Sequence, residues 1–170
     1  MKSKGFSTVF VFGLVAALFA APAWGQGKRR GEKVSYSHVI AKAECMVDGD
    51  DILVTAMLEQ SADSGPGTYD VGGVAFVLEE WGRGKRRFQE ITDSWAKMPV
   101  YLSFPEVAEG ERVEVATHLY EDVCSTLKID PSASALRAVV QIEVLNADPN
   151  RKGGLIHTGR CTSFPNPCRK

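Results

Sequence analysis

Apolar and polar residues alternate along most of this chain, which is the pattern of β-strands that bury one face. In the segment 39–47, every second residue from Val39 to Val47 is apolar. A second alternating segment covers 52–58, and the four residues between the two, 48–51, read DGDD. An Asp-Gly pair between two such segments favours a β-hairpin, so we expect these residues to form one.

Shorter alternating segments continue along the rest of the chain. They lie at 74–81, 87–91, 100–104, 112–120, 136–145 and 155–158. None of them has the spacing of three to four residues that marks an amphipathic helix, and 130–136 offers at most one helical turn. Stretches rich in turn-forming residues separate most of the segments. The longest of these, 61–73, has the length of a loop that crosses between two sheets.

The alternation also predicts which side chains face the core. Expected inward residues include Val74, Phe76 and Leu78, then Val100, Leu102 and Phe104, and then Val113, Val115, Thr117 and Leu119. His38, His118 and His157 each stand alone in the sequence, and we expect them at solvent-facing or edge positions.

These seven or eight short strands predict an all-β fold for the chain of 170 residues. The expected architecture is a single β-sandwich of Ig-like or Greek-key type, held by two disulfides. A closed β-barrel is the alternative, because alternation along the strands does not distinguish the two.

The first 25 residues have the features of a cleaved secretory signal peptide. Lys2 and Lys4 precede an apolar run from Phe6 to Ala21, and small-residue cleavage sites follow. A retained membrane anchor is the alternative, but the run is shorter than the roughly 20 residues of a spanning helix. We expect a signal peptide at 1–25, a flexible basic lead-in at 26–33, the β-sandwich domain at 34–160 and a Cys-containing tail at 161–170. The protein is then exported to a periplasm or out of the cell, with no retained transmembrane segment.

The four cysteines, Cys45, Cys124, Cys161 and Cys168, all follow the signal peptide and are expected to form two disulfides. If consecutive strands alternate in direction, Cys45 and Cys124 lie at opposite ends of the sandwich, too far apart to bond. That count favours Cys124–Cys161 with Cys45–Cys168, which fastens the tail to the domain. The competing pairing is Cys45–Cys124 with a local Cys161–Cys168 loop.

The sequence has no motif for catalysis or for a bound cofactor. It contains none of the short motifs of serine hydrolases, zinc proteases or phosphate-binding loops. The histidines and cysteines lack the close spacing of a zinc or copper site, and a hairpin turn accounts for the acidic residues 48–51 without calcium. We therefore predict no cofactor, no metal ligand and no catalytic residue.

One basic loop stands out in a chain of low net charge. The net charge is −1, and loss of the signal peptide removes two lysines and no acid, which makes it −3. The loop WGRGKRRF nevertheless gathers four cations, Arg83, Lys85, Arg86 and Arg87, as possible anion-binding residues. The alternative is a solvated hairpin tip whose charges keep the sheet edge soluble.

The sequence thus predicts an exported, non-catalytic binding or structural accessory module of the cell envelope or the exterior. Its expected partner is another protein or an envelope component, and nucleic acid is not expected. Two alternatives remain: a protein that binds polyanions through 83–87, and a hydrolase whose site is assembled from distant strands.

The polyanion alternative predicts heparin binding that weakens steeply with salt. Replacement of Arg83, Lys85, Arg86 and Arg87 by serine should abolish that binding, because the counterion release that drives it would be lost. Heparin-affinity chromatography over a salt gradient measures this. Elution that does not depend on salt or on the substitutions would exclude the alternative.

Overall fold

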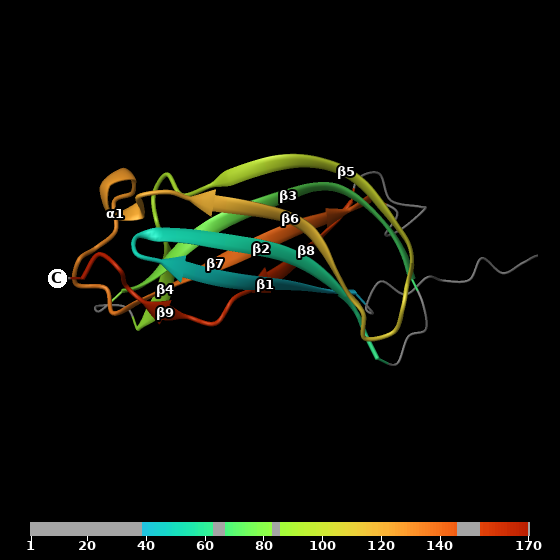
Figure 1. Ribbon diagram of the computed structural model, residues 1–170, viewed down its shortest axis with the longest axis horizontal. Coiled ribbons are helices and arrows are strands. Elements are labelled where there is room, and N and C mark those ends of the chain that lie inside the picture. Colours follow the sequence, from blue (N-terminus) through green and yellow to red (C-terminus); the bar gives the residue numbers. More distant parts are fainter. Residues whose placement is uncertain (1–38, 63–66, 83–85, 146–153, 170) are drawn as a thin grey trace, which may run out of the picture. The chain divides into compact units, whose positions relative to one another are not determined.

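The first hairpin forms as the alternation predicts. A computed structural model describes residues 39–62, 67–82, 86–145 and 154–169 (Figure 1). Strand β1 (Val39–Asp48) pairs antiparallel with β2 (Asp51–Gln60), and Asp48 stands opposite Asp51 across a two-residue turn. The other edge of β2 pairs antiparallel with β6 (Arg112–Tyr120). These three strands make a sheet in the order β1-β2-β6.

A second, six-stranded sheet packs against the first. Its strands are β3 (Gly67–Gly82), β4 (Arg87–Glu90), β5 (Ala96–Val107), β7 (Ala135–Val144), β8 (Leu155–Arg160) and β9 (Phe164–Pro165). The order is β4-β3-β7-β8, with β5 also on β3 and β9 also on β7. The helix α1 (Val123–Thr126) is a single turn, and no helix in the described ranges is long and apolar enough to cross a membrane.

Two successive strands, β4 and β5, share one edge of β3. Glu79 and Glu80 of β3 pair with both β7 and β4, while Val71 to Phe76 pair with β7 and β5. Since β7 occupies one edge throughout, β4 and β5 must both lie on the other. Both are antiparallel to β3, so they run in the same direction, one after the other.

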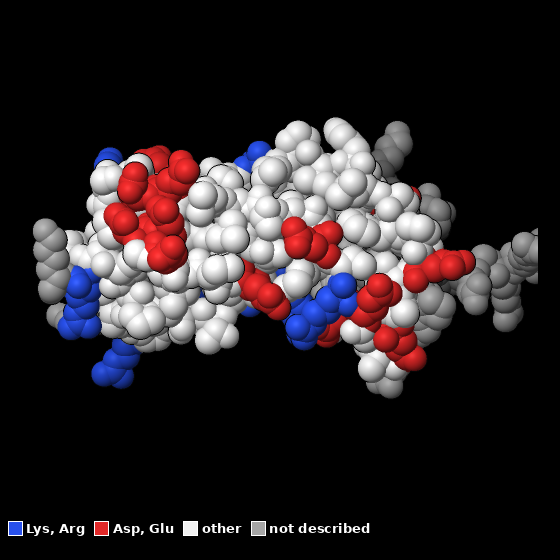
Figure 2. Space-filling view, viewed as in Figure 1, with Lys and Arg blue, Asp and Glu red and all other residues white. Residues whose placement is uncertain are grey.

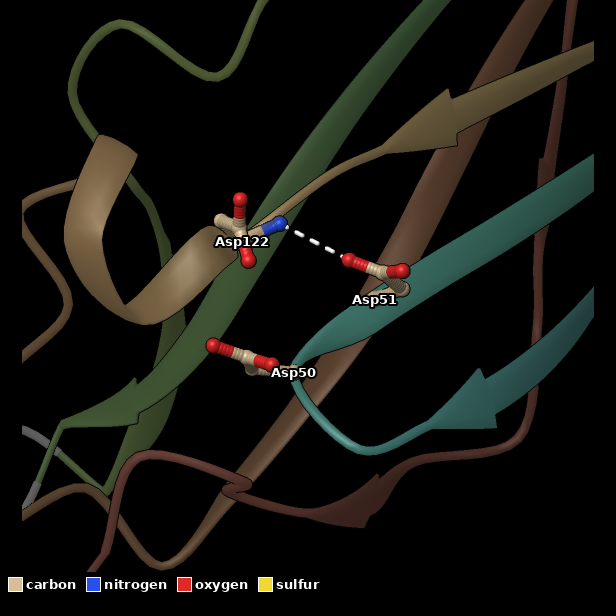
Figure 3. Close-up of side chains that lie close together, drawn as sticks. All are labelled: Asp50, Asp51 and Asp122. Carbon is tan, nitrogen blue, oxygen red and sulfur yellow. Dashed lines mark hydrogen bonds between the residues drawn. The ribbon is translucent and has the colours of Figure 1, made fainter.

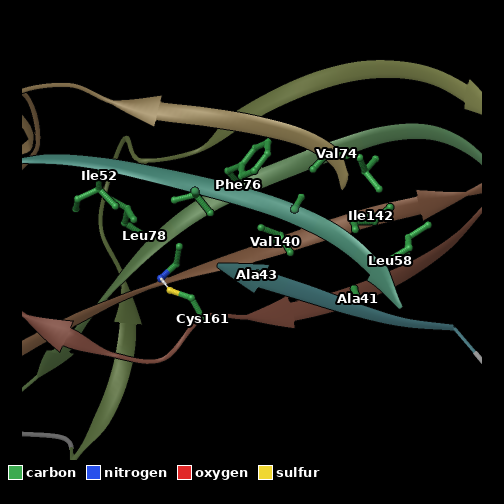
Figure 4. Packing of buried hydrophobic residues seen from close by; sticks show 14 of the residues in the cluster. Ala41, Ala43, Ile52, Leu58, Val74, Phe76, Leu78, Val140, Ile142 and Cys161 are labelled. Atoms are coloured by element: carbon green, nitrogen blue, oxygen red, sulfur yellow. Dashed lines mark hydrogen bonds between the residues drawn. The ribbon is translucent and has the colours of Figure 1, made fainter. Parts of the chain in front are cut away.

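The core lies between the sheets and is made of aliphatic residues from both (Figure 4). Ile52 and Leu58 of the smaller sheet and Val140 and Ile142 of the larger sheet are fully buried around Phe76. Val74 and Leu78 are also buried, as predicted. Each large aliphatic side chain that is removed from water in this way contributes roughly 1.5–3 kcal/mol.

The prediction of an all-β sandwich with two disulfides is confirmed, although the described residues form nine strands and not seven or eight. The Ig-like assignment and the domain boundaries remain predictions. Residues 67–73, predicted to be part of a crossing loop, instead begin β3. Their glycines weaken the local preference for a strand, but pairing with β5 and β7 on both edges overrides it.

A β-bulge corrects the predicted inward face of β6. Ala56 pairs with Ala116 but Met57 pairs with Glu114, which leaves Val115 as an extra residue. The extra residue reverses the alternation beyond it. Thr117 and Leu119, predicted to face the core, are therefore exposed. His118 and Tyr120 face inward in their place.

An irregular register in β5 also overturns the predicted inward orientation of one residue, Leu102. Between the pairs Val71–Leu102 and Gly73–Pro99, two residues of β5 stand opposite one of β3. Val100 and Phe104 pack against the core as predicted, whereas Leu102 is 44% exposed.

The prediction that the histidines face solvent or an edge is wrong for His118, whereas His157 does lie on an edge strand, β8, although it stands opposite the buried Ile142. The ring of His118 packs between Phe76 and Tyr120, with ring centroids 5.5 Å and 4.4 Å away. The Nε2 atom of His157 is buried and has no hydrogen-bond partner among the described residues. Burial lowers the pKa of both histidines, and a backbone hydrogen bond with Val39 partly opposes this for the pKa of His157. His38 lies outside the described residues.

The observed disulfides are Cys45–Cys161 and Cys124–Cys168, so both predicted pairings are wrong. The prediction counted 87–91 and 100–104 as strands of opposite direction, but β4 and β5 run the same way. Every later strand is therefore reversed relative to the prediction, and β1, β6 and β8 all point toward the end that carries α1 (Figure 1). This brings Cys45, Cys124 and Cys161 to the same end.

The tail is fastened to the domain and does not close on itself. Asn166 is buried, and its amide nitrogen donates hydrogen bonds to the carbonyl oxygens of Asp130 and Ala133, both at 3.1 Å. Its side-chain oxygen accepts a hydrogen bond from the backbone nitrogen of Cys168 at 3.0 Å. Cys168 is in turn bonded to Cys124 of α1, so the tail acts as a structural strap.

A second strap closes one side of the sandwich. Cys45–Cys161 joins β1, an edge of the smaller sheet, to the end of β8 in the larger sheet. A Cβ atom on Gly159 of β8 would lie 2.7 Å from the backbone of Ala41 in β1, so only glycine allows this approach.

A peptide map of the non-reduced protein should therefore contain Cys45–Cys161 and Cys124–Cys168. The bonds close loops with sequence separations of 116 and 44 residues. Replacing both cysteines of a pair by serine should lower the free energy of unfolding by about 5 and about 4 kcal/mol, respectively, in urea titrations. A map that contains a Cys161–Cys168 peptide would contradict the fold.

The two inward histidines should make stability fall as the pH drops below 6.5, their ordinary pKa. Their pKa values are lower in the folded protein, so the unfolded chain takes up protons first, and acid favours unfolding. Urea titrations from about pH 7.5 to about pH 5 measure the slope of the free energy of unfolding against pH. The variant with both His118→Gln and His157→Gln should lose most of it.

An unchanged slope in that double variant would contradict the buried placement of the histidines. Glu59 does not interfere in this pH range. Its hydrogen bond with Arg112 holds its pKa below the ordinary 4.5, so its contribution to stability is lost only at lower pH.

Candidate functional site

A groove of about 390 Å³ lies on the outer face of the larger sheet, along β3. The register of the sheet explains it. Gly73 of β3 stands between Pro99 of β5 and Glu143 of β7. Ala75 stands between Lys97 of β5 and Gln141 of β7. Small residues on the central strand thus form a floor between longer side chains on the two neighbouring strands.

Gly73 is the residue that keeps the floor low. A Cβ atom at Gly73 would meet only the carbonyl oxygen of Met98 at 3.4 Å and Oε2 of Glu143 at 4.0 Å, which are ordinary contacts. At the neighbouring Gly72, a Cβ atom would come within 2.7 Å of the Leu145 side chain. Packing therefore requires glycine at Gly72, whereas a side chain at Gly73 would fit and fill the groove.

The walls of the groove are amphipathic. Pro99 of β5 and Ile156 of β8, which is 57% exposed, contribute apolar surface, whereas Met98 stands opposite the inward Val74 and borders the groove with its backbone carbonyl. Lys97, Gln141 and Glu143 contribute one cation, one amide and one carboxylate. Such a lining can cover an apolar side chain while its polar groups hydrogen-bond to a polypeptide backbone.

An aromatic residue supports the Lys97 side of the groove. The Lys97 ammonium lies 5.9 Å from the centroid of the Trp95 ring, and the Trp95 indole nitrogen donates a hydrogen bond to Glu90 at 3.2 Å. A contact of a cation with an aromatic face is attractive, so Trp95 helps to hold Lys97 at the rim.

A cluster of carboxylates lies at the end of the sandwich that carries α1 (Figure 3). Ligand atoms of Asp50, Asp51 and Asp122 lie within 4.8 Å of one another. The backbone nitrogen of Asp122 donates a hydrogen bond to Oδ1 of Asp51 at 2.8 Å. Carboxylates of this kind suit a hard cation such as Ca²⁺. They are also common on protein surfaces without one, so the cluster by itself identifies no metal centre.

The structure describes only part of the predicted anion-binding loop. Arg83 and Lys85 lie outside the described residues, and Arg86 and Arg87 stand where β4 begins. Trp81 and Phe88 flank the loop and form a cross-strand pair with ring centroids 5.1 Å apart. Such a pair is an ordinary structural contact between neighbouring strands. Anion binding by the loop remains a prediction.

Sequence reasoning missed the groove because it assigned Gly72 and Gly73 to a loop. The available signal was the small residue at each outward position, Gly73 and then Ala75, beside the large inward residues Val74 and Phe76. That signal has meaning only once the segment is known to be a central strand with neighbours on both edges.

No protein-family model matches the chain, and a search of curated proteins finds no significant match. Among solved structures, CsgH from R. palustris is 13% identical over 76% of this chain and 93% of its own, with a TM-score of 0.31. Spo0M, a sporulation control protein from Bacillus subtilis, is 10% identical over 75% of this chain and 49% of its own, with a TM-score of 0.40. With TM-scores this low, the two likenesses carry no argument about function.

Proposed function

We propose that this protein is an exported, non-catalytic binding module that holds a polypeptide segment of a partner protein in the groove along β3. The observation that carries the proposal is the amphipathic groove over Gly73 and Ala75, on the face of the sheet that the core does not use. Its volume of about 390 Å³ is within the range of protein binding sites.

The exposure of the walls favours a polypeptide over a small molecule. Pro99 and Ile156 flank a shallow floor, and a small ligand in the groove would leave much of this apolar surface in water. A polypeptide laid across the walls covers both side chains and also meets Lys97, Gln141 and Glu143.

Export is supported by the leader-like sequence at 1–25 and by the two disulfides. Disulfides persist in oxidising compartments, so they fit an extracytoplasmic location. The polyanion-binding and hydrolase alternatives have no specific observation in their favour and remain predictions.

Filling the groove should abolish binding of partner segments. Peptides selected from a displayed library of random sequences against the full chain should bind Gly73→Leu at least about tenfold more weakly than the wild type, as expected when a central contact is lost. Ser103→Leu is the control, because it adds a leucine side chain at an exposed position of β5 that does not line the groove. It should leave the affinity unchanged.

Melting temperatures of both variants show whether the fold is intact, and Gly73→Ala provides a milder version of the change. The proposal fails if no peptide is enriched, or if the enriched peptides bind Gly73→Leu as well as they bind the wild type.

A further inference from the structure

The outer face of the smaller sheet carries an apolar row that nothing in the described structure covers. Met46, Leu53 and Leu119 are direct neighbours across β1, β2 and β6. Met46 is 64% exposed and Leu119 is 44% exposed. The bulge in β6 is what places Leu119 on this face, so the row arises only from the observed register.

An acidic row lies directly beside this apolar row. Two residues further along β1 and β2 stand Asp48 and Asp51, which the pleat places on the same face, and Glu121 directly follows the end of β6. Asp50 and Asp122 add two more carboxylates at this end. Figure 2 shows acidic side chains gathered at the end near α1, with an uncharged band beside them.

At the other end of the same face, several charges form ion pairs with one another. Lys42 lies 3.7 Å from Glu59, and Arg112 pairs with both Glu59 and Glu44. By contrast, none of the five carboxylates near α1 forms an ion pair with a lysine or arginine of the described residues. The negative potential beside the apolar row is therefore available to a cationic partner.

We propose that this face is a second docking surface, for a partner polypeptide that presents an apolar side chain and, two residues further along an extended segment, a lysine or arginine. The spacing follows from geometry. Side chains two residues apart on an extended chain point the same way and lie roughly 6.6 Å apart, as do the apolar and acidic rows of the sheet. The apolar side chain would cover Met46, Leu53 and Leu119, and the cation would meet the acids.

Three synthetic peptides with threonine at the intervening positions test this: one with leucine and lysine two residues apart, one with leucine and glutamate, and one with serine and lysine. Binding to the full chain is followed by NMR, with fluorescence anisotropy for affinity. Only the leucine–lysine peptide should bind, shifting resonances of β1, β2 and β6 near α1. Its affinity should fall with added salt.

Two variants separate the contributions of the two rows. Met46→Ser with Leu119→Ser removes the two exposed side chains of the apolar row, and Asp48→Asn, Asp50→Asn and Glu121→Gln together neutralise three of the five acids. Each should weaken binding by about tenfold or more. The controls are Tyr101→Ser, which removes one exposed apolar side chain elsewhere, and Asp93→Asn, Glu106→Gln and Glu109→Gln together, which remove three exposed carboxylates elsewhere; both should have little effect.

Several results would overturn the proposal. These are equal binding of the serine–lysine peptide, equal losses in the control variants, resonance shifts confined to the groove along β3, or Ca²⁺ binding by the acids without any peptide binding. The groove variant Gly73→Leu should leave this binding unchanged. Failure of this docking proposal is therefore distinguishable from failure of the binding proposed for the groove along β3.

Discussion

The 16 residues of β3 pair on one edge with two successive strands, and this pairing determines the direction of every strand that follows. Because β4 and β5 run the same way, β6 returns parallel to β1 and joins the edge of β2. The ends of β1, β6 and β8 then meet at one end of the sandwich (Figure 1). Both disulfides form there, and both straps depend on that meeting.

The corner between β4 and β5 is held by polar contacts that reach across the sandwich. The Ser94 hydroxyl donates to the Ile91 carbonyl at 2.8 Å and accepts from the Leu78 backbone nitrogen at 3.1 Å. The Tyr120 hydroxyl, from β6 in the other sheet, donates to the Ser94 carbonyl at 2.8 Å. Buried polar groups must be paired in this way, so the corner and β6 stabilise each other. Burial also raises the pKa of Tyr120, which keeps its hydroxyl a donor.

Irregular pairing shapes both outer faces. The register shift at Gly72 adjoins the low floor at Gly73, and the bulge at Val115 turns Leu119 outward beside Met46 and Leu53. Bulges reorient side chains at defined points of a sheet. In this protein the irregular pairings decide which residues face the core and which face the solvent. Strict alternation would have assigned several of these residues to the opposite face.

Alternation in the sequence was sufficient to predict the all-β class, most strand positions, the hairpin at Gly49 and core residues such as Phe76. These depend on local periodicity and on burial of one face, which a short segment reveals by itself. The four cysteines likewise indicated two disulfides. Their pairing, the inward placement of His118 and the groove over Gly73 were decided only by the tertiary structure. Each depends on strand direction or register, and these are set by pairing between residues far apart in the chain.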